Sequence, residues 1–323
     1  MRTVFLGTSE FAAAMLERLV ASDHRPVLVL SRPDRPRGRG RRVAAPPVAE
    51  RARALSVALE QPESVNAPQA REQIAQSRPE AVVVCAFGAL IKEPLLSEYE
   101  LLNVHPSLLP RWRGAAPVER AIMAGDEHTG VSIMRLTAGL DSGPVCLTAA
   151  EPMGPQDTYG SLATRLQVLG GELLVRTLDL LATGESPVFV EQDEAQVTYA
   201  EKIGPEDRLL DPARPASELE RVVRALHPHI GARVALGDGT LLGVHRAALA
   251  QEASTGRASL EAGEAAGSRE GEDRGGTGVS VRDDRLLLTC TPGTLELLEV
   301  QPPGGRAMDA AAYLRGHGPP GRL

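Results

Sequence analysis

The sequence predicts an α/β protein with a doubly wound, mostly parallel first domain, followed by a smaller C-terminal β-barrel domain of OB-like type. Three observations predict this fold class. The chain has 323 residues, which is more than one hydrophobic core usually serves. Short apolar runs alternate with amphipathic segments in the N-terminal half, as in parallel βα units. The C-terminal part instead carries strand-like runs separated by turn dipeptides.

The N-terminal half has the pattern of a sheet with helices on both faces. Strands are expected at the short strand-like runs, which lie at residues 2–7, 26–31, 57–61 and 81–88. Helices are expected between them, at residues 9–22, 47–55 and 67–76. Ser9 is placed to cap the first helix, and Ser64 or Asn66 to cap the third.

The same domain continues beyond residue 100. The run LLNVHP, residues 101–106, is a strand that Pro106 ends by removing a ladder donor. The elements expected after it are a helix near 116–124, strands at 130–136 and 144–151, and a long helix at about 158–182. This long helix has leucines at helical spacing and closes a first domain of residues 1–183.

An extended connector is expected at residues 184–202, and a second domain at residues 203–323. The second domain begins with an amphipathic helix and continues with strand-like runs, at residues 215–226 for the helix and 232–249, 278–290 and 294–301 for the runs. Asp238-Gly239 and Asp283-Asp284 supply turns, so a small β-barrel or an open antiparallel sheet is predicted. Residues 262–278 have almost nothing to bury, and a disordered surface loop is expected there.

Composition and charge limit the classes of function. No apolar stretch approaches the roughly 20 residues that span a bilayer, and the N-terminus lacks the apolar core of a signal peptide, so a cytoplasmic protein is expected, and we take it to be a monomer. A net charge of −7 argues against unspecific coating of nucleic acid. The stretch SRPDRPRGRGRR nevertheless concentrates positive charge. Its arginines are Arg32, Arg35, Arg37, Arg39, Arg41 and Arg42.

Two common kinds of cofactor site are not indicated. The turn FLGTSEF has only Gly7 of the three glycines in a dinucleotide-binding turn, which disfavours NAD. Its helix N-terminus could still favour another anion. Cys85, Cys146 and Cys290 lie far apart and none belongs to a C-x-x-C pair, so we expect buried, inert thiols and neither disulfides nor zinc.

The strongest candidate for chemistry is the end of the strand at 101–106. Asn103 and His105 are two residues apart, so their side chains point to the same face. They lie at the C-terminal edge of a parallel sheet, where α/β proteins bind ligands. An imidazole can move a proton at neutral pH, and a fixed amide can donate to a developing oxyanion. The alternative is that His105 is a satisfied structural group.

A group that orients the imidazole is needed, and LTAGLDSGPV offers Asp141 in a turn between two strands. Carboxylates commonly orient catalytic histidines by accepting a hydrogen bond from the ring. From composition alone, Asp141 could equally be an ordinary turn residue.

Residues 103–145, NVHPSLLPRWRGAAPVERAIMAGDEHTGVSIMRLTAGLDSGPV, resemble the signature of the 10-formyltetrahydrofolate-dependent formyltransferases. That signature combines Asn, His two residues later, S-L-L-P, R-G and a downstream L-D-[ST]-G. Nearly the whole chain is further similar to the methionyl-tRNA formyltransferases, through FLGTSEFA, RPDRPRGRGRR, CAFGALI, GAAPVERAIMAGD, VTYAEKI and LLEVQPPGGRAM. The exceptions are 262–278, which looks like an insertion, and RALHPHIGARVAL, where the family usually has an aromatic residue.

This resemblance implies a Rossmann-like catalytic domain that transfers a formyl group from 10-formyltetrahydrofolate to the α-amine of methionyl initiator tRNA, giving the N-formylmethionyl-tRNA of translation initiation. It implies direct transfer through a tetrahedral intermediate, without a metal. His105 would assist proton movement, Asn103 would hydrogen-bond the formyl oxygen, and Asp141 would orient His105 or a water.

The resemblance also implies binding residues. Folate would be bound by the turn after the strand and by an apolar wall, which comprise Ser107, Leu108, Leu109, Pro110, Phe87, Leu90, Ile91 and Leu140, although Phe87 and Leu90 could equally be core residues. The acceptor stem of tRNA would be bound by Arg35, Arg39, Arg41 and Arg42, unless these form only a solvated basic loop. The C-terminal β domain would contact tRNA.

Two rival functions remain open from the sequence. One keeps the folate chemistry but uses a small amine as acceptor, and the arginine-rich loop together with a C-terminal β domain disfavours it. The other is a non-catalytic RNA-binding protein that kept the scaffold, and the joint presence of Asn103, His105 and Asp141 speaks against it.

Overall fold

The computed structural model describes residues 1–37, 42–184, 187–250 and 278–317. Its contacts divide the chain into two compact units. The first comprises Met1–Ala121 and Asp126–Lys202, and the second comprises Ile122–Gly125 and Ile203–Leu323. Each unit is described by itself below.

The first unit contains a seven-stranded sheet in the order β10-β9-β7-β6-β1-β2-β5. Its parallel part consists of β1 (Thr3–Gly7), β2 (Pro26–Leu30), β5 (Leu59–Glu60), β6 (Ala81–Cys85) and β7 (Leu101–His105). The antiparallel edge consists of β9 (His128–Arg135) and β10 (Val145–Pro152). Every residue of β1, β6 and β7 is buried, as the continuous apolar runs predict. The predicted doubly wound, mostly parallel domain is confirmed.

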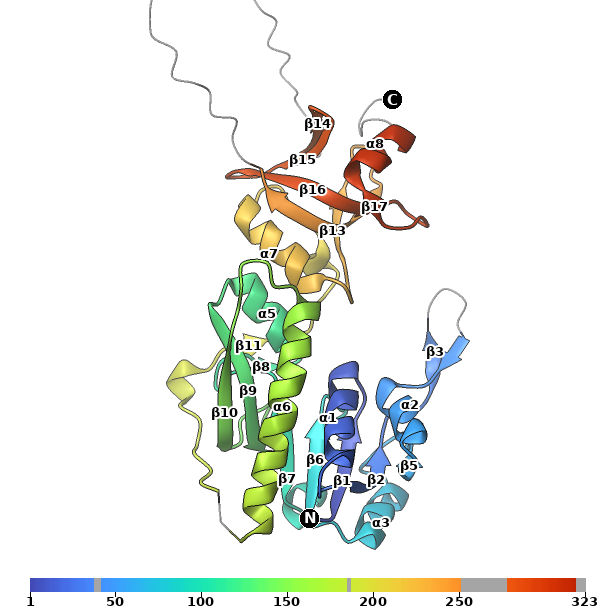
Figure 1. Ribbon diagram of the computed structural model, residues 1–323, viewed down its shortest axis with the longest axis vertical. Coiled ribbons are helices and arrows are strands. Elements are labelled where there is room, and N and C mark those ends of the chain that lie inside the picture. Colours follow the sequence, from blue (N-terminus) through green and yellow to red (C-terminus); the bar gives the residue numbers. More distant parts are fainter. Residues whose placement is uncertain (38–41, 185–186, 251–277, 318–323) are drawn as a thin grey trace, which may run out of the picture. The chain divides into compact units, whose positions relative to one another are not determined.

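Helices cover both faces of this sheet. The helices of this part of the chain are α1 (Glu10–Val20), α2 (Pro47–Ala54), α3 (Pro68–Ser77), α4 (Leu95–Glu98), α5 (Pro117–Ala124) and α6 (Tyr159–Ala182), and the end of α5, from Ile122, groups with the second unit. The helices α1 and α6 run side by side in Figure 1 and contact each other closely. On the other face, Ala70 and Ile74 of α3 pack with Leu6, Val82 and Leu101 of the strands.

One predicted helix cap is confirmed and one is wrong. The hydroxyl of Ser9 accepts a hydrogen bond from the N–H of Ala12 at the start of α1. At α3 neither Ser64 nor Asn66 caps the helix, whose cap position is Ala67. The reason is that the amide of Asn66 bonds the distant segment at Leu90 and Lys92 instead.

The arginine-rich stretch forms part of a short hairpin that the sequence did not indicate. β3 (Arg35–Arg37) pairs antiparallel with β4 (Arg42–Ala44). Residues 38–41 between them lie outside the described residues. The hairpin therefore brings the two ends of this basic stretch next to each other.

The expected connector belongs by its contacts to the first unit. Val190 forms an isolated bridge with Val145, and Glu194–Gln196 form a single 3-10 turn. Further on, β11 (Tyr199–Ala200) pairs in parallel with β8 (Arg113–Gly114). Residues 187–202 thus contact β10 and the loop that follows β7.

The second unit is an antiparallel half-barrel sheet in the order β12-β13-β16-β15-β14, with β17 beside β16. The strands are β12 (Ala232–Ala235), β13 (Leu241–Leu249), β14 (Val279–Arg282), β15 (Arg285–Thr289), β16 (Thr294–Gln301) and β17 (Met308–Asp309). The helices are α7 (Ala216–Leu226) and α8 (Ala310–His317), preceded by a 3-10 turn at Glu206–Arg208. The predicted C-terminal β domain is confirmed.

The predicted turns of this second unit have the expected backbone. Asp283 and Asp284 have φ values of 48° and 57°, and Gly239 has a φ of 81°. Two consecutive left-handed residues are what a tight hairpin turn requires. The expected loop at 262–278 lies outside the described residues, except for Gly278.

No helix in the described parts of the chain is long and apolar enough to cross a membrane.

Candidate active site

Asn103 and His105 lie at the C-terminal end of β7, with β6 on one side and β9 on the other. They point to the same face of the sheet, because side chains alternate along a strand. Val104 between them points toward α6, where a Cβ on Gly170 would lie 3.4 Å from its side chain. The two polar residues therefore face away from α6. They are largely buried, with exposed fractions of 7% for Asn103 and 4% for His105.

Asp141 comes from the turn between β9 and β10, and its carboxylate reaches both residues. Nδ2 of Asn103 donates to its Oδ1 at 3.4 Å, and Nδ1 of His105 lies 3.7 Å from its Oδ2. The N–H of Gly114 donates to the same Oδ2 at 2.9 Å. Asp141 has a φ of 44°, in the left-handed region that Asp tolerates better than most residues. The structure therefore brings together the three residues that were predicted to be catalytic.

The contacts of His105 determine which ring nitrogen can exchange a proton. Nε2 lies 2.9 Å from the carbonyl oxygen of Trp112. A carbonyl oxygen can only accept, so Nε2 carries hydrogen. Nδ1, which faces Asp141, is therefore the ring nitrogen whose hydrogen the contact with Trp112 does not fix.

Trp112 is held so that its carbonyl can face His105. Its φ of 65° is unusual for a bulky residue. The indole Nε1 donates to Oδ2 of Asp126 at 2.8 Å, and the backbone N–H donates to the hydroxyl of Thr198 at 2.9 Å. The guanidinium of Arg111 lies 4.4 Å from the indole centroid and donates two hydrogen bonds to Asp126. These contacts hold Trp112 in its unfavourable backbone conformation, which persists only where the surrounding structure imposes it.

The turn after β7 is braced from within. The hydroxyl of Ser107, which is fully buried, donates to the carbonyl of Arg111 at 2.6 Å. Ser132 in β9 donates to the carbonyl of Ser107 at 2.7 Å and accepts from the N–H of Leu109 at 3.1 Å. The Ser107 hydroxyl thus uses its one hydrogen inside the turn. Leu108 is half-buried against β9, where it lies beside Gly130.

The other residues predicted to line the folate pocket differ in exposure. Phe87 and Ile91 are buried, at 4% and 5% exposed, and they pack in the core on the α3 side of the sheet. Leu90 and Leu140 are 65% and 62% exposed. The exposed pair can contact a ligand, whereas the buried pair belongs to the core.

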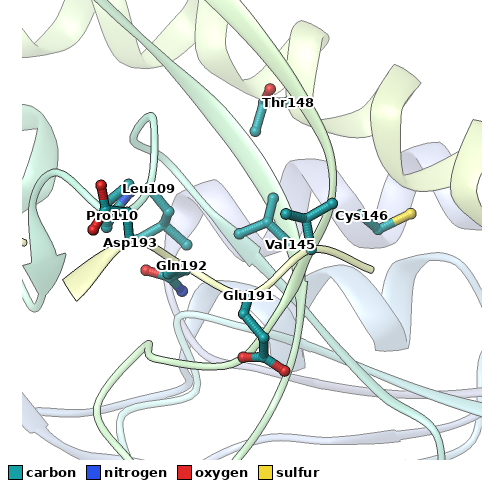
Figure 2. Close-up of a pocket in the computed structure, with 9 residues that line it drawn as sticks. Leu109, Pro110, Val145, Cys146, Thr148, Glu191, Gln192 and Asp193 are labelled. Atoms are coloured by element: carbon teal, nitrogen blue, oxygen red, sulfur yellow. The ribbon is translucent and has the colours of Figure 1, made fainter. Parts of the chain in front are cut away.

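A cavity of about 280 Å³ lies on the same face of the sheet as Asn103 and His105. Its Thr148 is opposite Ser132, which is itself opposite His105, so the three side chains share that face. Figure 2 shows the turn at Leu109, the strand β10 and the segment at Gln192 around it. The lining residues are Leu109, Pro110, Val145, Cys146, Thr148, Val190, Glu191, Gln192 and Asp193. The residues that line the cavity include none of the three side chains that were predicted to be catalytic.

Comparisons with known proteins identify the family. The family model described as Formyl transferase matches residues 1–178, and the one described as Formyl transferase, C-terminal domain, matches residues 202–318. A methionyl-tRNA formyltransferase of Halorhodospira halophila is 41% identical over 98% of this chain and 96% of its own length. The chain belongs to the methionyl-tRNA formyltransferase family. A second member of that family, from Methylococcus capsulatus, is 40% identical over 98% of this chain and 97% of its own length.

Solved structures show that the formyltransferase fold extends over both units. HypX from Aquifex aeolicus in complex with tetrahydrofolic acid has a TM-score of 0.61 at 17% identity, covering 97% of this chain and 47% of that one. This chain therefore corresponds to about half of HypX. WlaRD, a sugar 3N-formyl transferase, has a TM-score of 0.59 at 13% identity, covering 92% of this chain and 96% of that one. At these identities the likeness shows the fold alone.

The arginines predicted to contact tRNA lie on or between the strands of the β3–β4 hairpin. Arg35, in β3, donates to Glu63 at 3.1 Å, and both side chains are exposed. Arg42 belongs to β4. Arg39 and Arg41 lie outside the described residues. An exposed ion pair such as that of Arg35 contributes at most about 1 kcal/mol, so this formyltransferase can exchange it for another anion.

The three cysteines, all of which lie in described parts of the chain, are free thiols. Burial raises the pKa of the Cys85 thiol far above its usual range, and Cys290 is buried too, as expected of inert thiols. Cys146 differs from the expectation, since it is half-buried and lines the cavity. Among the residues that the structure describes, no group of three or more His, Cys, Asp or Glu is arranged to hold a metal ion.

Sequence reasoning missed several residues of this formyltransferase site. The carbonyl of Trp112 and the N–H of Gly114 hold His105 and Asp141, but backbone groups leave no signal in residue types. Gln192 was assigned only to the connector. Its amide bonds the Asp141 turn 51 residues away in sequence, a separation that no local pattern can reveal.

Proposed function

We propose that this chain transfers a formyl group from 10-formyltetrahydrofolate to the α-amine of methionine on initiator tRNA, giving N-formylmethionyl-tRNA. The observation that carries the proposal is the meeting of Asn103, His105 and Asp141 at the C-terminal edge of the sheet, in a chain that belongs to this family. The enzyme would act as a monomer in the cytoplasm, where it would bind the formyl donor and the charged tRNA.

The side chains of the site can serve each stage of the transfer. As the amine attacks the formyl carbon, one carbon–nitrogen bond forms and the carbonyl electrons move to oxygen. Asn103 has two amide hydrogens, and one bonds Asp141, so the other can donate to this oxyanion. Nδ1 of His105 accepts the proton that the amine loses. Asp141 stabilises the resulting imidazolium.

Collapse of the tetrahedral intermediate requires a proton on the leaving nitrogen. His105 can return its proton to N10 of the folate as the bond between N10 and the formyl carbon breaks. The imidazole is then neutral again, and no other group on the enzyme has changed. Burial of Asn103 and His105 limits competition from water for the same groups.

The folate donor fits the apolar side chains that this edge of the sheet leaves exposed. Leu90 and Leu140 expose most of their surface, and the flat pterin ring is a suitable partner for such groups. Phe87 and Ile91 would support this wall from the core. Ser107, Leu108, Leu109 and Pro110, in the hydrogen-bonded turn after β7, would contribute the remaining contacts with the folate.

The arginines of the hairpin are proposed to bind the acceptor stem of tRNA. Arg35, Arg39, Arg41 and Arg42 concentrate positive charge on a chain whose net charge is −7. A locally basic loop on an acidic protein steers a polyanion to one place and not over the whole surface.

The test is formylation of charged initiator tRNA by the purified protein, with and without 10-formyltetrahydrofolate. We expect N-formylmethionyl-tRNA only when the donor is present. A control enzyme of the family, run in parallel, shows that both substrates are competent. If the control formylates the tRNA and this protein does not, the proposal is wrong. Competition by small amines, such as amino sugars, then distinguishes a change of acceptor from a loss of catalysis.

A further inference from the structure

We infer that Gln192 is a positioning residue of the formyl-transfer site, which acts on the reaction by fixing the turn that carries Asp141. The inference rests on the proposed function, in which Asp141 is catalytic. It concerns a segment that lies beyond the match to the N-terminal family model, which ends at residue 178.

The side-chain amide of Gln192 makes three hydrogen bonds, two with the turn that carries Asp141 and one with Arg113. Nε2 donates to the carbonyl of Asp141 at 2.8 Å and to the carbonyl of Gly143 at 2.7 Å. Oε1 accepts from Nε of Arg113 at 2.9 Å. Two acceptors on one side and a donor on the other fix the orientation of the amide. A single side chain thus holds both ends of the Asp141–Gly143 turn.

This turn needs support because its backbone is unfavourable. Asp141 has a φ of 44°, a left-handed conformation that a residue other than glycine keeps only where its surroundings impose it. Gly143 is packed so closely that a Cβ there would lie 1.9 Å from the carbonyl oxygen of Arg135. The hydrogen bonds from Gln192 act on the two backbone groups that flank this strained stretch.

Gln192 is itself held by a buried cation. Arg113 is 3% exposed, and besides Gln192 it donates to Glu194, at 2.8 Å for the shorter bond. Arg113 directly precedes Gly114, whose N–H donates to the carboxylate of Asp141. Arg113 and Gly114 also pair with β11 of the same segment. The N–H of Gly114 therefore bonds the carboxylate of this turn, and the amide of Gln192 bonds two of its carbonyls. Gln192 belongs to the segment at 192–200, and Gly114 pairs with the β11 strand of that segment.

The test compares two variants with a matched control. Gln192→Ala removes all three hydrogen bonds. Gln192→Glu keeps an acceptor for Arg113 but sets a carboxylate against two carbonyl oxygens. We expect kcat to fall in both by roughly tenfold to a hundredfold, because a displacement near 1 Å at a catalytic group costs about that much. The KM values for folate and tRNA should change little. Gln196→Ala, an exposed position on the same segment, should keep the wild-type kcat.

A double-variant cycle separates positioning from general stability. If Gln192 acts through Asp141, Gln192→Ala should lower kcat much less in an Asp141→Asn background than in the wild type. Equal fold losses in the two backgrounds would overturn the inference. So would an unchanged kcat accompanied by a lower Tm, since that describes a purely structural residue. An inactive wild-type protein would instead refute the proposed function, so the two failures are distinguishable.

Discussion

At the residue scale, Asn103 is the side chain whose removal should affect the reaction most directly. Asn103→Ala deletes the donor to the oxyanion but leaves His105 and Asp141 in place. We expect kcat to fall by about 10²–10³-fold, the usual loss for one oxyanion donor. Steady-state kinetics with charged tRNA measures this loss. Gln69→Ala, an exposed position on α3, serves as the control. A rise in KM at constant kcat would make Asn103 a binding residue instead.

The sequence predicts part of this site at the residue scale, and the reason lies in strand geometry. Two-residue spacing on β7 places Asn103 and His105 on one face, as the structure has them. Local chemistry alone left Asp141 as a possible turn residue, and the family resemblance added its role. The groups that hold them could not be predicted, because the Trp112 carbonyl and the Gln192 amide reach the site through folding.

At the element scale, the turn between β9 and β10 should tolerate no side chain at Gly143. A Cβ there would lie 1.9 Å from the carbonyl oxygen of Arg135, so Gly143→Ala must displace the backbone beside Asp141. We expect formylation activity to fall by roughly a hundredfold or more. In α6, a Cβ at Gly170 would meet its nearest neighbours at 3.4 Å, an ordinary contact. Gly170→Ala should therefore keep its activity, and equal losses in both variants would contradict this reasoning.

The start of α6 should make the protein sensitive to acid. Hydrogen bonds from Arg165 above all hold the pKa of Asp157 well below its usual range, and Gly154 and Ser161 add to them. A lowered native pKa means that the carboxylate stabilises the fold above about pH 4, and that this stability is lost as the pH falls below that value. Asp157→Asn should lower the free energy of unfolding at neutral pH by about 2 kcal/mol.

That difference between wild type and Asp157→Asn should shrink at about pH 3, because there the Asp157 carboxylate of the unfolded chain is protonated while that of the native protein is still ionised. Urea unfolding at the two pH values measures it. Asp23→Asn removes an exposed carboxylate and provides the comparison. A difference that stays constant with pH would show that Asp157 acts through packing and not through its charge.

Length decides which elements the sequence can predict. The long helix at 158–182 is found as α6, Tyr159–Ala182, because its leucine periodicity extends over many turns. The two-residue strands β8 and β11 have no periodicity to detect, and the hairpin of β3 and β4 has three residues on each side. Such short strands form because partners elsewhere in the fold offer backbone groups, as Thr198 and Ala200 do for the loop at 113–116.

At the scale of the whole molecule, charge is divided unevenly. The chain carries 42 acidic and 35 basic residues, yet six arginines fall within residues 32–42. Composition therefore predicts an acidic protein, and only the pattern along the chain predicts a polyanion site. The same reasoning found two domains, but it set 184–202 apart as a connector, whereas contacts group residues up to Lys202 with the first unit. Apolar periodicity cannot report hydrogen bonds such as those of Gln192.

Salt dependence tests whether the arginine-rich stretch binds tRNA through phosphate. Arg39→Ala should weaken binding of charged tRNA, and it should reduce the slope of log affinity against log salt by about one, because one fewer counterion is released. Fluorescence titration at several salt concentrations measures both quantities. The control is Arg25→Ala, which removes the same charge from an exposed position just before β2. Arg25 lies at the N-terminal end of its strand, whereas Asn103 and His105 lie at the C-terminal end of β7. Equal changes of slope in the two variants would mean that total charge, and not this stretch, determines binding. A change confined to Arg39→Ala, with kcat at saturating tRNA preserved, would identify the stretch as a docking site that is separate from the chemistry at His105.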